Sequence, residues 1–154
     1  DTIDVERMMG LVKAMTESLA YQLRKGEKLT SCVSVKIRYS DFSTLSKQAK
    51  ISYTAADHVL IPVVTSLFEK LYNRRLLVRL VGVRFSDLTE GYYQINMFDD
   101  WEKTVGLYQS MDAIRDRFGA LKISSAATMH EKGVASMHNP FNGEPPIIPA
   151  HRNA

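Results

Sequence analysis

Two stretches of alternating polarity lie close together in the chain and constrain its fold more than any other feature. In residues 32–39, valine, isoleucine and tyrosine occupy every second position, with serine, lysine and arginine between them. Residues 44–53 repeat this period of two, interrupted at Lys47, which we expect near a sheet edge. Because successive side chains of a strand point to opposite faces, each stretch predicts a half-buried strand. The short, turn-prone link at residues 40–43 predicts that the two strands form an antiparallel hairpin.

Segments with apolar residues at three- and four-residue steps flank this hairpin and predict two helices. The first covers residues 4–25, with Asp4 as its N-cap and Gly26 as its stop. The second covers residues 56–73, where Pro62 predicts either a helix start near Ile61 or a kink. We expect the second helix to turn five apolar residues inward, namely Val59, Val63, Leu67, Phe68 and Leu71.

A third strand is predicted at residues 76–88, and its central glycine, Gly82, indicates either a bulge or a close backbone approach. The order helix, strand, strand, helix, strand predicts an α+β fold built as a two-layer sandwich. We expect a mainly antiparallel sheet of three to four strands with both helices on one face.

Composition limits the number of domains, the possible partners and the cellular compartment. The 154 residues suit one domain with appendages, and the net charge of +3 permits a nucleic-acid partner without requiring one. The single cysteine, Cys32, excludes an internal disulfide, which suits a protein of a reducing compartment. We expect Cys32 to be buried in a strand. No apolar run reaches the roughly 18 residues that a membrane helix needs, and no signal peptide is visible, so we expect a cytoplasmic protein without a membrane partner. The chain begins at Asp1 rather than Met, so we expect a fragment or a processed product.

Cations and short polar side chains share the predicted outer face of the sheet, a combination that suits contacts to phosphates. By pattern alone, however, an ordinary solvated face is favoured. The residues with this parity are Lys36, Arg38, Lys50, Arg84, Ser34, Ser46, Gln48 and Ser52.

Residues 91–100 form a short apolar stretch closed by two aspartates. One interpretation is a peptide that lies in another protein's groove, with Gln94 as its polar anchor and Ile95, Met97 and Phe98 as its apolar bulk. The other is a fourth strand at residues 92–98, paired with the third strand through a turn at residues 87–91.

Residues 101–118 predict a helix, followed by a short strand at residues 121–123 and an irregular, proline-rich end. We expect one apolar stripe on this helix, formed by Val105, Tyr108, Met111, Ile114 and Phe118. We expect the charged residues to be solvated, namely Glu102, Lys103, Asp112, Arg115, Asp116 and Arg117. The chain shows no phosphate loop, zinc pattern or catalytic triad, so no catalytic or metal-binding residue is assigned.

Four segments, taken in order, resemble the C-terminal part of Y-family translesion DNA polymerases of the bacterial polymerase IV type. They are VKIRYSDF at residues 35–42, LVGVRFSDL at residues 80–88, QINMF at residues 94–98 and DAIRDRFG at residues 112–119. The resemblance implies a little finger domain, in which a four-stranded sheet backed by two helices grips DNA backbone phosphates. The family's first strand would precede Asp1, leaving three strands and a bare sheet edge here.

The resemblance also implies roles for individual residues and for the parent enzyme. It implies DNA contacts by Lys36, Arg38, Gln48, Lys50, Arg79 and Arg84, and contacts to the bacterial sliding clamp by Gln94, Ile95, Met97 and Phe98. In a strict alternation, Arg79 would point to the core. A bulge at Gly82 would reconcile this position with a DNA contact, as would an Arg79 side chain that reaches the sheet edge.

We therefore expect an accessory region that grips primer-template duplex and recruits an error-prone polymerase to the clamp during DNA repair. The region would be non-catalytic alone, since the Mg²⁺-dependent nucleotidyltransferase domains lie outside this sequence. The expected division is a DNA-binding domain (1–90), a clamp-binding peptide (91–100), a helical tail (101–128) and an irregular end (129–154). The alternative is a protein-interaction module whose basic face is only solvated.

Overall fold

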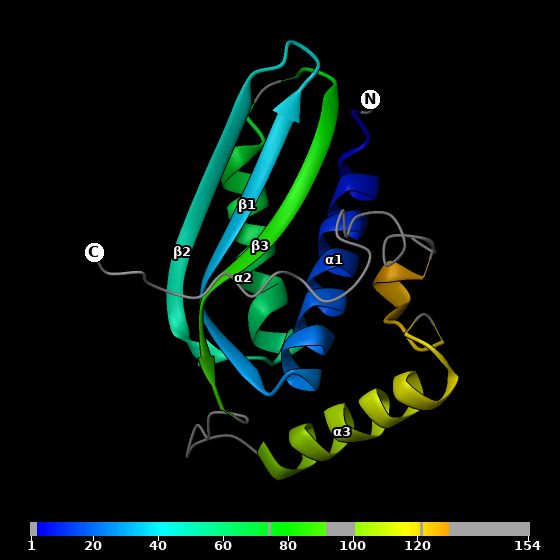
Figure 1. Ribbon diagram of the computed structural model, residues 1–154. Coiled ribbons are helices and arrows are strands. Elements are labelled where there is room, and N and C mark those ends of the chain that lie inside the picture. Colours follow the sequence, from blue (N-terminus) through cyan, green and yellow to red (C-terminus); the bar gives the residue numbers. More distant parts are fainter. Residues whose placement is uncertain (1–2, 74, 92–100, 121, 130–154) are drawn as a thin grey trace, which may run out of the picture.

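The protein is described here from a computed structural model, which places residues 3–73, 75–91, 101–120 and 122–129. Three helices, three strands and one short 3₁₀ helix follow one another along this part of the chain (Figure 1). They are α1 (Val5–Lys25), β1 (Lys28–Tyr39), β2 (Thr44–Thr54), α2 (Asp57–Leu71), β3 (Val78–Glu90), α3 (Trp101–Phe118) and η1 (Ala126–Thr128).

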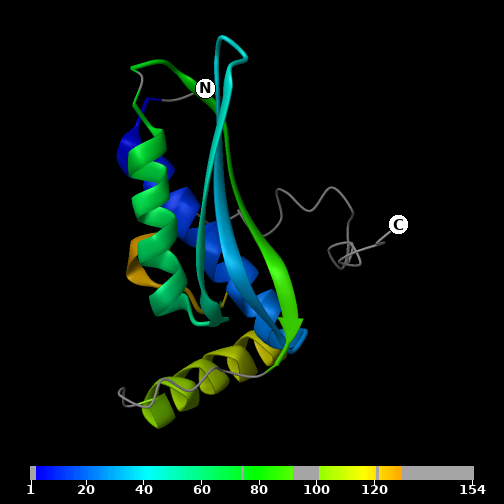
Figure 2. The ribbon, with the colours of Figure 1, turned by 90° about the vertical axis from the view of Figure 1, so that its left-hand side faces the viewer.

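The three strands form one antiparallel sheet in the order β2-β1-β3, so the hairpin partner and the last strand flank β1. Both α1 and α2 lie on the same side of this sheet, as Figure 2 shows. The alternation in β1 turns Val33, Val35, Ile37 and Tyr39 toward the helices, where all four are fully buried. The predicted two-layer α+β sandwich is confirmed.

Helix α1 begins and ends where the sequence predicts. The Asp4 side chain accepts a hydrogen bond from the backbone N–H of Arg7 at 3.0 Å, as an N-cap does. Gly26 caps the other end by donating its N–H to the carbonyl of Gln22. These caps satisfy backbone groups that the helix leaves unpaired at its ends.

Helix α2 starts at Asp57, so the predicted start near Ile61 is wrong and Pro62 lies in the second turn. Its buried face carries Leu60 and Val64, which were not predicted, whereas the expected Val59 is exposed and the expected Val63 is only partly buried against the core. The segment is apolar on almost every side in its first half, so helical spacing alone could not select the face that packs on the sheet.

The irregular position in β3 is Arg79 and not Gly82. Gly82 pairs in register with Lys36, whereas the pairing changes between Arg38 and Tyr39 and leaves Arg79 as the extra residue. The predicted bulge at Gly82 is therefore wrong. The shift at Arg79 removes the conflict between its charge and its parity, because a bulge re-aims the side chain it contains.

Strand β3 continues to Glu90, so the turn expected at residues 87–91 in the fourth-strand interpretation is not formed. Residues 92–98 themselves lie outside the described residues. Downstream, α3 has the predicted bounds, but residues 122 and 123 form a bend rather than the expected strand. Among the residues that the structure describes, no helix is long and apolar enough to cross a membrane.

Candidate nucleic-acid interface

The face of the sheet opposite the helices carries most of the residues predicted to contact DNA. Residues that pair across antiparallel strands point to the same face, so the register defines rows of neighbouring side chains. One row is Gln48, Ser34 and Arg84, the next is Ser46, Lys36 and Gly82, and a third is Thr44, Arg38 and Leu80. We call this surface the open face.

Five predicted residues come together on the open face and the sixth lies at its border. Lys36, Arg38, Gln48, Lys50 and Arg84 are exposed there, with Lys50 opposite Cys32. Arg79 is also exposed, at the irregular position in β3. From strand spacing and rise, the patch measures roughly 10 Å by 20 Å. Cys32 itself is buried, as predicted.

The open face has no compensating negative charge in its central rows. Residues 32–38, 44–50 and 80–86 contain no aspartate or glutamate. Within the described part of the chain, no ion pair is recorded for Lys36, Arg38, Lys50, Arg79 or Arg84. An anion could therefore bind these cations without breaking an existing ion pair.

Gly82 lies in the central row of this patch, on strand β3 beside Lys36. A Cβ added at Gly82 would meet only the end of the Leu80 side chain, at 4.0 Å. The packing around Gly82 thus has room for a larger residue, although glycine weakens a strand interior. Apart from its chain neighbours, no backbone atom of the described residues approaches this Cβ closely, so the predicted close approach stays a prediction for a ligand.

Phe42 is a residue of this surface that sequence reasoning treated only as part of the hairpin turn. Its ring is 58% exposed, and the guanidinium carbons of Arg38 and Arg79 lie 5.1 Å and 4.9 Å from its centroid. The available signal was a large aromatic residue in a short turn otherwise composed of polar residues.

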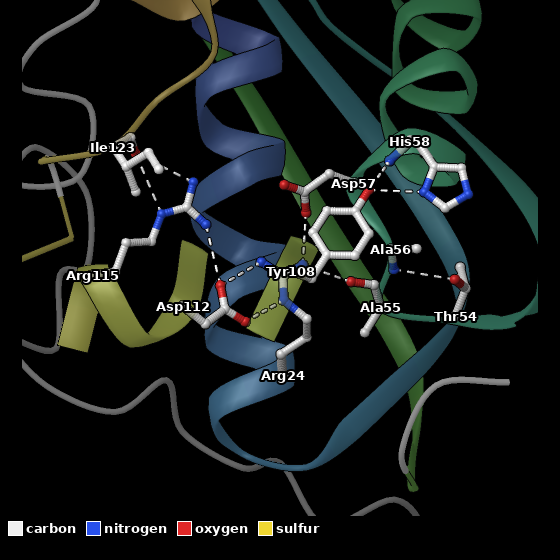
Figure 3. A network of polar contacts seen from close by, with 10 residues as sticks. All are labelled: Arg24, Thr54, Ala55, Ala56, Asp57, His58, Tyr108, Asp112, Arg115 and Ile123. Atoms are coloured by element: carbon white, nitrogen blue, oxygen red, sulfur yellow. Dashed lines mark hydrogen bonds and ion pairs between the residues drawn. The ribbon is translucent and has the colours of Figure 1, made fainter. Parts of the chain in front are cut away.

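A second polar cluster lies where the C-terminal end of α1 meets α2 and α3 (Figure 3). Arg24, whose side chain is 4% exposed, donates from Nε to Asp112 Oδ2 at 2.6 Å and from Nη1 to Asp57 Oδ1 at 2.7 Å. Its Nη1 also donates to the carbonyl of Ala55. One guanidinium thereby joins three segments that are distant in the sequence.

The ionisation of this cluster follows from its burial and its contacts. Burial alone would lower the pKa of Arg24, but the hydrogen bonds and charges of Asp112 and Asp57 outweigh it and raise the pKa above the ordinary value. Burial raises the pKa of Asp57, and Arg24 opposes that rise. With a permanently charged guanidinium 2.7 Å away, we assign Asp57 as a carboxylate at neutral pH.

Helix α3 packs through polar side chains in this cluster. The Tyr108 hydroxyl accepts from the backbone N–H of His58 at 2.9 Å and lies 2.8 Å from its Nδ1, and Arg24 covers the Tyr108 ring at 4.8 Å. Arg115 is 4% exposed and contacts Asp112 and the carbonyl of Ile123.

The expectation for the two faces of α3 is therefore wrong in part. Asp112 and Arg115 were predicted to be solvated, yet they belong to the packed side. Ile114 and Phe118 were predicted to pack, yet they are 40% and 58% exposed. The cause is Arg24, because a buried guanidinium on the neighbouring helix needs carboxylate partners more than apolar contact.

The four predicted clamp-binding residues, Gln94, Ile95, Met97 and Phe98, lie outside the described residues. In the part of the chain that the structure covers, no group of three or more His, Cys, Asp and Glu side chains is arranged to hold a metal ion.

Comparison with known families agrees with this architecture. Residues 1–97 match the impB/mucB/samB family C-terminal domain. The chain belongs to that family. It is the little finger domain of the Y-family DNA polymerase IV type, as the resemblance implied. The match covers the sheet, α1 and α2, and it stops before α3.

Curated relatives carry the same assignment. The chain is 32% identical over 123 residues to "DNA polymerase IV" of Clostridium acetobutylicum, covering 77% of this chain and 31% of that protein. It is 25% identical over 148 residues to "DNA polymerase IV 1" of Bacillus subtilis, covering 92% of this chain and 36% of that protein. "DNA polymerase IV" of Opitutus terrae is 32% identical over 118 residues, covering 75% and 29%. The chain thus spans about a third of the length of these relatives.

Proposed function

We propose that this little finger domain binds primer-template duplex DNA through its open face. The observation that carries the proposal is the set of exposed cations on one sheet face, with no acidic residue in the central rows and no ion pair recorded for them within the described part. Lys36, Arg38, Lys50 and Arg84 would neutralise backbone phosphates and release counterions. Ser34 and Gln48 would donate short hydrogen bonds that position the backbone.

Gly82 supports the same proposal, because it has no side chain to keep DNA away from the sheet. A glycine between Lys36 and the free edge of the described sheet lets a phosphate or sugar approach the backbone of β3. Phosphate contacts carry no sequence information, so the expected binding is independent of DNA sequence.

Substituting Arg84 tests the assignment of the open face. Arg84→Ala should weaken duplex binding about 3- to 10-fold and flatten the dependence of log K on log salt by about one unit, because one phosphate contact is lost. Fluorescence anisotropy with a labelled primer-template duplex at several salt concentrations measures both quantities. Unchanged affinity and slope would contradict the proposal, and equal retention on neutral and anionic columns would favour a protein-interaction module instead.

Recruitment to the sliding clamp is the second part of the proposal. Gln94 would anchor the peptide by its amide, and Ile95, Met97 and Phe98 would fill an apolar pocket. Changing Gln94, Met97 and Phe98 together to alanine should abolish capture by an immobilised bacterial clamp. Retained capture would remove this peptide from the proposal.

We assign polymerisation to the rest of a parent translesion enzyme rather than to this chain. The parent would perform Mg²⁺-dependent nucleotidyl transfer in the cytoplasm during DNA damage tolerance. The little finger would hold the duplex in place while that chemistry occurs.

A further inference from the structure

The tip of the β1–β2 hairpin carries an exposed aromatic ring in an unusual backbone conformation. Phe42 has φ 65°, a left-handed conformation that side chains other than glycine adopt rarely. The turn is closed by hydrogen bonds from the Phe42 N–H to the Tyr39 carbonyl and from the Tyr39 N–H to the Ser43 carbonyl. Asp41 accepts from the backbone N–H and the hydroxyl of Ser43. These contacts fix the backbone of the turn that carries Phe42 at the end of the open face.

Two arginines from different strands converge on this ring. Arg38 comes from the end of β1, and Arg79 comes from the irregular position in β3, where the change of pairing frees it from strict alternation. Each guanidinium carbon lies about 5 Å from the ring centroid, so the two cations are no more than about 10 Å apart. A guanidinium stacked on an aromatic face still offers its N–H groups at its edge.

This arrangement leaves two exposed positive charges available to an anion. Arg38 and Arg79 are both exposed, and no ion pair is recorded for either arginine in the described residues. Asp41 is the acidic residue of the turn, and its carboxylate already accepts two hydrogen bonds from Ser43. An aromatic ring that fixes two guanidinium groups without neutralising them suits recognition of phosphate, which accepts charge-assisted hydrogen bonds from arginine edges.

We infer that Arg38, Phe42 and Arg79 form a preorganised subsite for backbone phosphates of DNA at the hairpin tip. Phe42 is its positioning residue, since its ring orients both guanidinium groups. This inference rests on the proposed DNA-binding function and adds a subsite with an uncharged residue at its centre. The sequence could not show that the three side chains meet, because Arg79 reaches Phe42 only through the shifted pairing of β3.

The test compares Phe42→Leu, which keeps apolar bulk, with Phe42→Tyr, which keeps the aromatic face. We expect Phe42→Leu to weaken binding of the 154-residue chain to a labelled duplex about 3- to 10-fold and to lower the salt slope, because phosphate contacts are lost. Phe42→Tyr should bind like the unaltered chain. Thermal unfolding of both variants checks that the fold is retained, which the exposure of Phe42 favours.

A double-mutant cycle separates positioning from a direct contact. In an Arg38→Ala, Arg79→Ala background, Phe42→Leu should have no further effect on affinity or salt slope. An equal loss in both backgrounds would overturn the positioning role, and so would wild-type binding by Phe42→Leu.

Arg84→Ala distinguishes failure of the subsite from failure of the proposed DNA-binding function. If Arg84→Ala weakens binding and Phe42→Leu does not, the open face binds DNA without this subsite. If the unaltered chain shows no salt-dependent duplex binding, the proposed function fails together with the subsite.

Discussion

Two groups of arginines in this domain have opposite surroundings. Arg24 and Arg115 are buried, and each contacts carboxylate or carbonyl oxygens between α1, α2 and α3. Arg38, Arg79 and Arg84 are exposed on or beside the open face, and no ion pair is recorded for them in the described residues. Burying a guanidinium is too costly without anionic partners, whereas an exposed one keeps its hydration. The first group therefore stabilises the fold, and the second is available to a ligand.

The largest expected effect comes from removing the buried cation. Arg24→Met leaves Asp57 and Asp112 without their main partner, and breaking a buried ion pair in this way costs about 3–5 kcal/mol of unfolding free energy. Chemical denaturation of the full chain measures the loss. The matched control is the next residue, Lys25, which is exposed and lies 3.7 Å from Asp116. Lys25→Met should cost less than about 1 kcal/mol. Similar losses for both variants would contradict the division into two groups.

A smaller effect, on binding alone, is expected at Gly82. Gly82→Val should leave the unfolding midpoint unchanged or slightly higher, because there is room for the side chain and valine favours strands. The same change should weaken duplex binding about 10-fold by blocking close approach to β3. Paired thermal and anisotropy measurements check this. A destabilised domain would contradict the room assigned to this position, and full duplex affinity would show that Gly82 does not serve binding.

Removing one hydroxyl probes the docking of α3. Tyr108→Phe deletes the acceptor for the backbone N–H of His58 while keeping the ring beneath Arg24. The expected loss is about 1 kcal/mol in unfolding free energy, with no change in duplex binding. The outcome against this assignment would be an unchanged unfolding curve.

A further effect is a dependence of stability on alkaline pH. Burial, together with the hydrogen bond and charge of Asp116, raises the pKa of Tyr21 from 10.0 to about 12. The unfolded chain releases this proton at lower pH than the folded chain, so the contribution is full below pH 10 and is lost between about pH 10 and 12. Burial also raises the pKa of Tyr108, which acts in the same direction. Urea midpoints between pH 8 and pH 11.5 should fall less steeply for Tyr21→Phe than for the unaltered chain; parallel curves would argue against the assignment.

Local pattern was sufficient for most of the fold because the elements obey the periodicities of their own backbones. The caps of α1, the alternation in β1 and the bounds of α3 are properties of neighbouring residues. Pattern failed in α2, where apolar residues surround the first half of the helix and offer more than one face. It also left two alternatives open at Gly82, because a glycine permits a bulge without specifying where the pairing shifts.

By itself, then, the sequence determined the α+β class, the family and the residues that share the open face. Only the tertiary structure decided which cations are paired and which are not. Arg24 meets Asp57 and Asp112 across three helices, and Arg79 meets Phe42 across a shifted pairing of strands. The physical reason is that ion pairs and ring stacking depend on distances of a few ångströms between segments far apart in the chain. Those distances follow from strand register and helix packing. A period of two or of 3.6 residues shows which side chains share a face, but not which segment packs against that face.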